Sequence, residues 1–143
     1  MLGAGVAVGG ILQEPVVRES LAESNNPRGA TDRVLGLSRV TVQPGAELAL
    51  HHHEGTQIAR IEQGTLSYTV ESGEVRVKAG DPDAGTAELV QTIEAGETAK
   101  IRAGQWIVEQ PSDIHRAANR GKREIVIYLA TLLRKGAPPS TPD

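Results

Sequence analysis

Short aliphatic segments, separated by turns that contain glycine, make up most of this sequence. The turns include Pro44-Gly45, Gln63-Gly64 and Ser72-Gly73. Valine, isoleucine and threonine favour pleated strands, and glycine supplies the positive φ that tight turns require. The expected strands cover residues 34–42, 47–53, 57–62, 65–71, 74–78, 88–93, 98–102, 105–109, 114–119 and 124–133. Strands of this length and spacing predict an all-β barrel or sandwich.

The segments on either side of these strands carry weaker signals. Residues 1–12 are apolar, and two interpretations stay open for them: an arm packed on the barrel or on a partner subunit, or the remnant of an export signal. Residues 14–24 suit a short helix. The Pro-rich residues 134–143 have too little apolar surface to order themselves. We therefore expect an N-terminal arm over 1–33, a barrel domain over 34–133 and a flexible tail over 134–143.

Composition narrows the range of functions. A chain of 143 residues suits one domain, and the lack of cysteine excludes thiolate catalysis and thiolate metal sites. The net charge is −3, and no cationic stripe is present that would displace the counterions of a nucleic acid. The apolar start is shorter than the roughly 20 residues of a membrane span. We expect no nucleic-acid or membrane partner and a cytoplasmic location, with an exported form as the alternative.

The core is expected to be aliphatic. The chain has no Phe, one Trp and two Tyr, so Val, Ile, Leu and Ala must fill the interior. Tyr68, Trp106 and Tyr128 then either line a cavity or pack in the core and at its rim.

The four histidines fall in two places. His51, His52 and His53 are consecutive, and His115 lies far downstream. Because alternate side chains of a strand share a face, His51 and His53 are expected to point together and His52 the opposite way. Gln57 begins the next expected strand and returns to the same face. Three imidazoles and one oxygen donor suit a divalent transition metal, whereas an isolated His-x-His pattern is more often a surface feature.

The region around these residues resembles the first cupin motif, G-x5-H-x-H-x3,4-E-x6-G. The segment from Gly45 to Gly64 matches it at every spacing, with Gln57 in the place of the glutamate. This resemblance makes a metal site the favoured interpretation of the histidines.

A second segment is similar to the second cupin motif, G-x5-P-x-G-x2-H-x3-N. Gly104, His115 and Asn119 match, while Pro111 is displaced by one residue and Ser112 stands where the family has glycine. The resemblance covers about residues 34–133. It implies a cupin jelly-roll β-barrel, frequent dimers, and His51, His53, Gln57 and His115 as ligands of one divalent ion, which we expect to be Mn, Ni, Zn or Fe.

A glutamine ligand changes the expected chemistry. Its amide oxygen is neutral, so the bound ion keeps its full charge and becomes a stronger Lewis acid. Cupins that resemble this chain in using glutamine include enzymes that linearise unsaturated uronates and some polyketide cyclases. We therefore expect a metal-dependent enzyme that isomerises, cyclises or eliminates from a small oxygenated metabolite. A dioxygenase and a non-catalytic sugar-binding or metabolite-binding cupin are the alternatives.

Two further expectations concern single residues and assembly. Glu47 lies four residues before His51 and is expected on the same inward face, where a carboxylate can act as general base. A solvated position at the barrel mouth is the alternative for Glu47, and most glutamates are exposed. The expected partners are a small-molecule substrate and a second copy of the chain in a homodimer.

Overall fold

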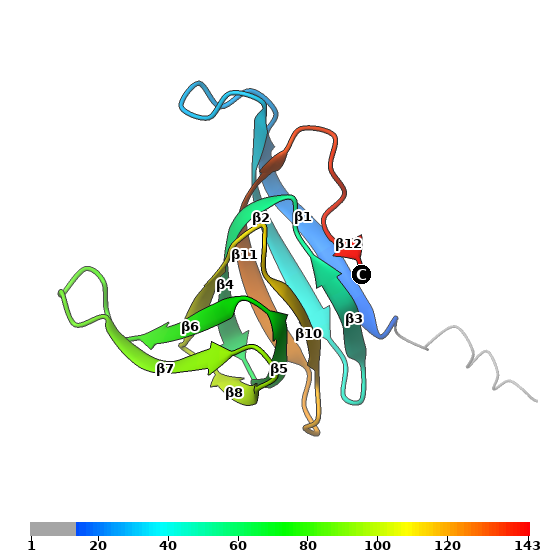
Figure 1. Cartoon of the computed structure of the whole chain (residues 1–143), viewed down its shortest axis with the longest axis vertical. Coiled ribbons are helices and arrows are strands. Elements are labelled where there is room, and N and C mark those ends of the chain that lie inside the picture. The colour runs from blue at the N-terminus through cyan, green and yellow to red at the C-terminus, as the bar shows by residue number, and fades with distance from the viewer. Residues whose placement is uncertain (1–13) are drawn as a thin grey trace, which may run out of the picture.

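The computed structural model describes residues 14–143 and folds them into two β-sheets that enclose one core (Figure 1). The strands are β1 (Val16–Ser24), β2 (Arg33–Val42), β3 (Glu47–His52), β4 (Gly55–Gln63), β5 (Thr65–Ser72), β6 (Glu74–Ala79), β7 (Glu88–Glu94), β8 (Thr98–Arg102), β9 (Trp106–Glu109), β10 (Ile114–Ala118), β11 (Ile125–Arg134) and β12 (Thr141–Pro142). The jelly-roll class predicted from the sequence is therefore confirmed. Within the described residues there is no helix of the length and hydrophobicity that a membrane crossing requires.

The larger sheet has the order β1-β2-β11-β4-β9-β6-β7, and the smaller has the order β12-β3-β10-β5-β8. Every pairing is antiparallel. Both sheets contribute to the core: Ile61 and Ile107 belong to the larger, and Val70 and Ile101 to the smaller. Tyr68 is the one aromatic side chain among the described core residues, so the predicted aliphatic interior is confirmed.

The sequence predicts a short helix over residues 14–24, but strand β1 occupies Val16–Ser24, so that expectation is wrong. The strand pairs with β2 from Val16 to Ser24 and forms an edge of the larger sheet. Glu, Ala and Leu are good helix formers, but intrinsic propensity is a weak preference, and the edge of β2 overrides it by offering a row of backbone partners. The apolar residues 1–12, with their two interpretations, lie outside the described residues.

The C-terminal segment is ordered, in contrast to the flexible tail that the sequence predicts. After β11 the chain turns back, and β12 pairs with β3 through Thr141 opposite His52 (Figure 1). The Asp143 backbone N–H also donates to the Leu50 carbonyl. Proline lacks a backbone donor but is tolerated at a sheet edge, where β12 lies. The tail is therefore ordered by its pairing with β3, and not by burial of its own apolar side chains.

The turn between β3 and β4 depends on one glycine. A Cβ atom on Gly55 would lie 2.1 Å from the carbonyl oxygen of Leu132 in β11. Only glycine permits so close a backbone approach. This contact lets β4 lie against β11 directly after His53, and it sets where Gln57 enters the interior.

Candidate metal centre

Three histidines meet inside the barrel. His51 lies near the end of β3, and His53 comes directly after that strand. His115 in β10 lies directly opposite His51 in the strand pairing. One ring nitrogen from each lies within 4.8 Å of the others. His53 and His115 are only 4% and 1% exposed. The convergence predicted for His51, His53 and His115 is therefore present, whereas the ion itself stays a proposal.

The outer ring nitrogens of two of these histidines are held by the backbone. The Nδ1 of His51 lies 2.6 Å from the Ala49 carbonyl oxygen, and the Nδ1 of His53 lies 2.8 Å from that of Pro139. A carbonyl only accepts, so each Nδ1–H donates and each Nε2 keeps its lone pair. This is the arrangement that prepares an imidazole for a metal ion.

Burial keeps these two rings neutral. Desolvation lowers the pKa of both His51 and His53 from the ordinary value of 6.5, against the opposing attraction of Glu109. Metal ions bind the neutral form of imidazole, so the same burial that penalises a proton leaves the nitrogen available to a cation.

His52 points away from the cluster, as the strand alternation predicts. Its Nδ1 lies 2.6 Å from an Asp143 carboxylate oxygen in the C-terminal segment. The side chain therefore anchors the tail to β3 and takes no part in the centre.

A buried carboxylate, which the sequence prediction missed, completes the cluster. Glu109 at the end of β9 is 4% exposed. Its Oε2 lies 2.7 Å from His115 Nε2, and its Oε1 lies 3.7 Å from His53 Nε2. Burial raises the pKa of Glu109, but the hydrogen bond from His115, with further contributions from the neighbouring imidazoles and the Tyr68 hydroxyl, outweighs it and lowers the pKa to about 2. The side chain is therefore ionised.

Tyr68 is the second group attached to this carboxylate. Its hydroxyl donates to Glu109 Oε2 at 2.6 Å, and its ring stacks on that of His115 with centroids 5.4 Å apart. Burial, followed by the charge of Glu109, raises the pKa of the phenol well above its ordinary value of 10.0. Tyr68 is thus a protonated donor on the cavity wall, as one of its two sequence interpretations allowed.

Gln57 reaches the cluster, but its amide nitrogen faces the other members. The Nε2 donates to Glu109 Oε1 at 2.6 Å and lies 3.2 Å from His53 Nε2. The Oε1 atom, the predicted metal ligand, is buried without a hydrogen-bond partner in the described part of the chain.

Glu47 does not share the face of His51, in contrast to the expectation from simple alternation. Between His115 and Ala117 the pairing of β10 with β3 shifts, so that Ala117 lies opposite Leu48. This bulge reverses the phase of β3, and Leu48 packs against the core while Glu47 turns outward. The Glu47 side chain is 66% exposed, borders the cavity and lies 3.9 Å from Arg120. It therefore sits at the solvated rim.

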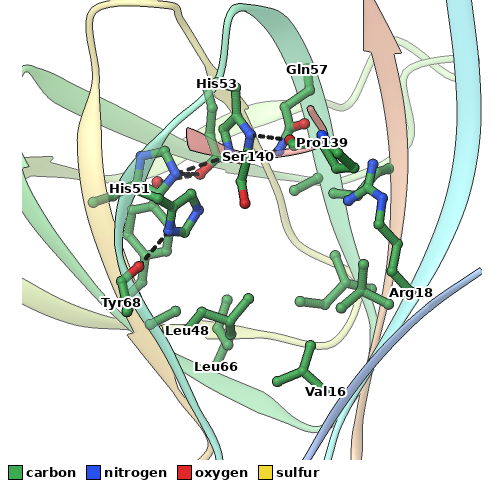
Figure 2. A pocket seen from close by; sticks show the side chains of 18 of the residues that line it. Val16, Arg18, Leu48, His51, His53, Gln57, Leu66, Tyr68, Pro139 and Ser140 are labelled. Carbon is green, nitrogen blue, oxygen red and sulfur yellow. Dashed lines mark hydrogen bonds and ion pairs between the residues drawn. The ribbon is translucent and has the colours of Figure 1, made fainter. Parts of the chain in front are cut away.

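The cluster lies at one end of a cavity of about 500 Å³. Figure 2 shows the imidazoles and Gln57 on one side, with Leu48, Leu66 and Val16 on the opposite wall. Arg18 from β1 also lines this space, and among the described residues no carboxylate forms an ion pair with it. A mostly apolar pocket with a few convergent polar groups is typical of a small-molecule site.

The residues present fit a divalent ion. His115 Nε2 lies 2.7 Å from Glu109 Oε2 and 3.3 Å from His53 Nε2. A carboxylate only accepts, so in the metal-free protein a proton on His115 Nε2 fills this position, and a divalent ion would take its place. Imidazole nitrogens and a nearby carboxylate are ligands that first-row transition metals prefer. The site is thus chemically suited to the ion that the sequence predicts.

Comparison with known proteins supports the architecture. The cupin-domain family model matches residues 38–81, which contain His51, His53 and Gln57. No curated protein sequence matches the chain.

Solved structures share its fold at low sequence identity. KdgF from Halomonas sp. has a TM-score of 0.52 and 20% identity, over 84% of this chain and 82% of that one. A cupin 2 domain-containing protein from Halorhodospira halophila has a TM-score of 0.57 and 12% identity, over 93% and 74%. The DMSP lyase DddQ from Ruegeria pomeroyi has a TM-score of 0.55 and 15% identity, over 91% of this chain and 50% of that one. These structures show the fold of the chain, and residues 38–81 are in addition similar to the cupin-domain family model.

Proposed function

We propose that this chain is a metal-dependent cupin enzyme that acts on a small oxygenated metabolite by isomerisation, cyclisation or elimination. The observation that carries the proposal is the convergence of three imidazole nitrogens at the polar end of an otherwise apolar cavity. His51, His53 and His115 would hold one divalent ion, Mn, Ni, Zn or Fe. Such an ion supplies a Lewis acid that polarises a substrate oxygen.

Tyr68 provides the proton that this chemistry needs. Isomerisation and elimination both move a proton to or from a substrate atom, and a positioned side chain speeds that step by roughly 10²–10⁴-fold. The Tyr68 phenol stays protonated, because burial and the adjacent Glu109 charge disfavour the phenolate. Its hydroxyl therefore carries a proton at neutral pH and would give it to a substrate carbanion or oxyanion that is more basic than the phenolate.

Arg18 indicates that the substrate carries a negative charge. Its guanidinium lines the cavity, and no carboxylate of the described residues forms an ion pair with it. An arginine binds a carboxylate through two parallel hydrogen bonds. Unsaturated uronates, which cupins with a glutamine ligand linearise, carry a carboxylate. DMSP, the substrate named for the structurally similar lyase DddQ, carries one as well.

The test combines metal analysis with a substrate panel. Protein loaded separately with Mn, Ni, Zn and Fe is incubated with unsaturated uronates and with DMSP, and products are followed by NMR while an electrode records oxygen. The proposal expects product that requires metal and forms without oxygen uptake. Turnover that is equal after chelation would contradict it.

A dioxygenase is the second candidate, and Glu109 is the observation that favours it. The expectation of Lewis-acid chemistry depends partly on neutral ligands, because they leave the bound ion its full positive charge. The buried carboxylate 2.7 Å from His115 supplies the negative charge that stabilises an oxidised iron. Iron-dependent oxygen consumption that occurs only with substrate would identify this activity. Binding of a panel compound without any turnover would identify a non-catalytic cupin.

Assembly and location stay proposals. The outer face of the larger sheet carries an apolar row in which Leu37 lies opposite Ala130, and Ala130 opposite Ile58. Leu37 and Ile58 are 43% and 45% exposed. We place the homodimer contact on this row, because burying it removes apolar surface from water. A cytoplasmic location remains a prediction from the sequence.

A further inference from the structure

The position where the cupin motif has its glutamate is occupied by Gln57, yet a carboxylate lies directly across from it. In the antiparallel pairing of β4 with β9, the Cα partner of Gln57 is Glu109. Side chains of directly opposed residues share one face of a sheet and lie close together. Glu109 therefore enters the interior at the same level as Gln57, from the neighbouring strand.

The carboxylate oxygens face the nitrogen atoms that a metal ion would use. Oε2 lies 2.7 Å from His115 Nε2, and Oε1 lies 3.7 Å from His53 Nε2. The Nδ1 of His53 is held by Pro139, so Nε2 is the atom that remains for coordination. Two of the three imidazoles thus direct their inner nitrogens toward Glu109.

Hydrogen bonds fix the carboxylate in this orientation. Gln57 Nε2 donates to Oε1 at 2.6 Å, and the Tyr68 hydroxyl donates to Oε2 at 2.6 Å. No arginine or lysine forms an ion pair with Glu109 anywhere in the described residues. A carboxylate that is 4% exposed is costly without a countercharge, and a bound cation would supply one.

The geometry points to Glu109 as the anionic ligand of the metal centre, with Gln57 as the residue that positions it. A glutamate on the neighbouring strand would then take the role that the cupin motif gives to the glutamate at the position of Gln57. Gln57 then acts through its amide N–H, and not through the oxygen that the sequence predicts as a ligand. This inference rests on the proposed function, because it assigns a ligand to the same metal.

The experiment measures metal affinity in four proteins purified without a chelating column. They are the wild type, Glu109→Gln, the exchanged variant Gln57→Glu/Glu109→Gln, and Glu62→Gln as a control for loss of an exposed carboxylate. Competition with a chromophoric chelator gives the dissociation constant for Zn²⁺ and Mn²⁺. Thermal melting of the metal-free proteins reports whether each variant folds.

We expect Glu109→Gln to bind at least tenfold more weakly than the wild type, since even outer partners of metal ligands cost about 10–100-fold. The exchanged variant restores a carboxylate on the other strand and is expected within about tenfold of the wild type. Glu62→Gln should bind as the wild type does. Equal affinity of folded Glu109→Gln and wild type would overturn the inference.

A crystal structure of the Zn²⁺-loaded wild type decides the question even if Glu109→Gln does not fold. The inference expects a Glu109 oxygen at the Zn–O distance of about 2.0–2.2 Å. A Gln57 oxygen at that distance, with Glu109 outside it, would refute the assignment. Failure of the proposed function has a separate signature, because the wild type itself would then bind no metal.

Discussion

At the scale of single residues, a variant of Tyr68 can distinguish a role in proton transfer from a role in metal binding. The hydroxyl is held by Glu109, whereas no ring nitrogen of the histidine cluster depends on it. Tyr68→Phe removes only the hydroxyl. We expect its kcat with an active panel substrate to fall by about 10²–10⁴-fold even when excess metal keeps the centre occupied. Recovery of activity on adding excess metal would show that the hydroxyl only supports the centre.

The buried imidazoles predict a pH dependence of stability in the metal-free protein. Desolvation lowers the folded-state pKa of His51 and His53 below the ordinary 6.5, so below that pH the unfolded chain binds more protons than the folded one. Stability is then present above about pH 6.5 and is lost as the pH falls.

Urea denaturation of the chelated protein between about pH 5 and pH 7 measures this loss. The free energy of unfolding should decrease toward pH 5 in the wild type. The decrease should be shallower in His51→Gln, which lacks one of the two groups. A wild-type stability that is flat or rises over this range would contradict the argument.

The sequence could predict the histidines of the centre but not its carboxylate. The spacing of His51, His53 and Gln57 is local, and a motif captures it. Glu109 follows Trp106, Ile107 and Val108, and alternation alone allows either Trp106 and Val108 or Ile107 and Glu109 to face inward. Only the pairing of β9 with β4, between residues 52 positions apart, shows that Glu109 is buried.

At the scale of elements, the C-terminal segment is part of the site. The Pro139 carbonyl fixes the His53 ring, and Pro139 and Ser140 line the cavity (Figure 2). Pro142 lines it as well. Deleting residues 136–143 removes this support and exposes the edge of β3. We expect metal affinity to fall by about 10–100-fold, as for other outer partners of histidine ligands.

A chelator competition on the truncated and full-length proteins checks this, with circular dichroism to confirm that the sheets persist. Unchanged affinity in a folded truncated protein would show that the tail covers the cavity without positioning His53.

The two terminal segments and the Glu47 bulge differ from the sequence-based expectation for one physical reason. Residues 14–24 and 134–143 have weak intrinsic preferences, and each gains its structure by pairing with an edge strand, β2 or β3. The bulge that turns Glu47 outward likewise depends on the register between β3 and β10. Local composition does not encode these partners, whereas the turns and internal strands follow from residues close in sequence.

At the scale of the whole molecule, the apolar row on the larger sheet predicts self-association. Leu37→Glu/Ile58→Glu places two charges on adjacent parts of this face, and we expect it to convert a dimer to a monomer. Light scattering after size exclusion measures the mass. Leu89→Glu is a matched control, since Leu89 is 54% exposed on β7 and outside the row. A monomeric wild type, or a double variant that stays dimeric, would contradict the proposed interface.

The central claim is that His51, His53 and His115 together hold one metal ion. Metal analysis by mass spectrometry, on protein purified without a chelating column, tests it most directly. The wild type and His52→Ala should each contain about one divalent ion per chain, and His51→Ala and His115→Ala should contain almost none. Equal metal in all four proteins, or none in the wild type, would contradict this account of the site.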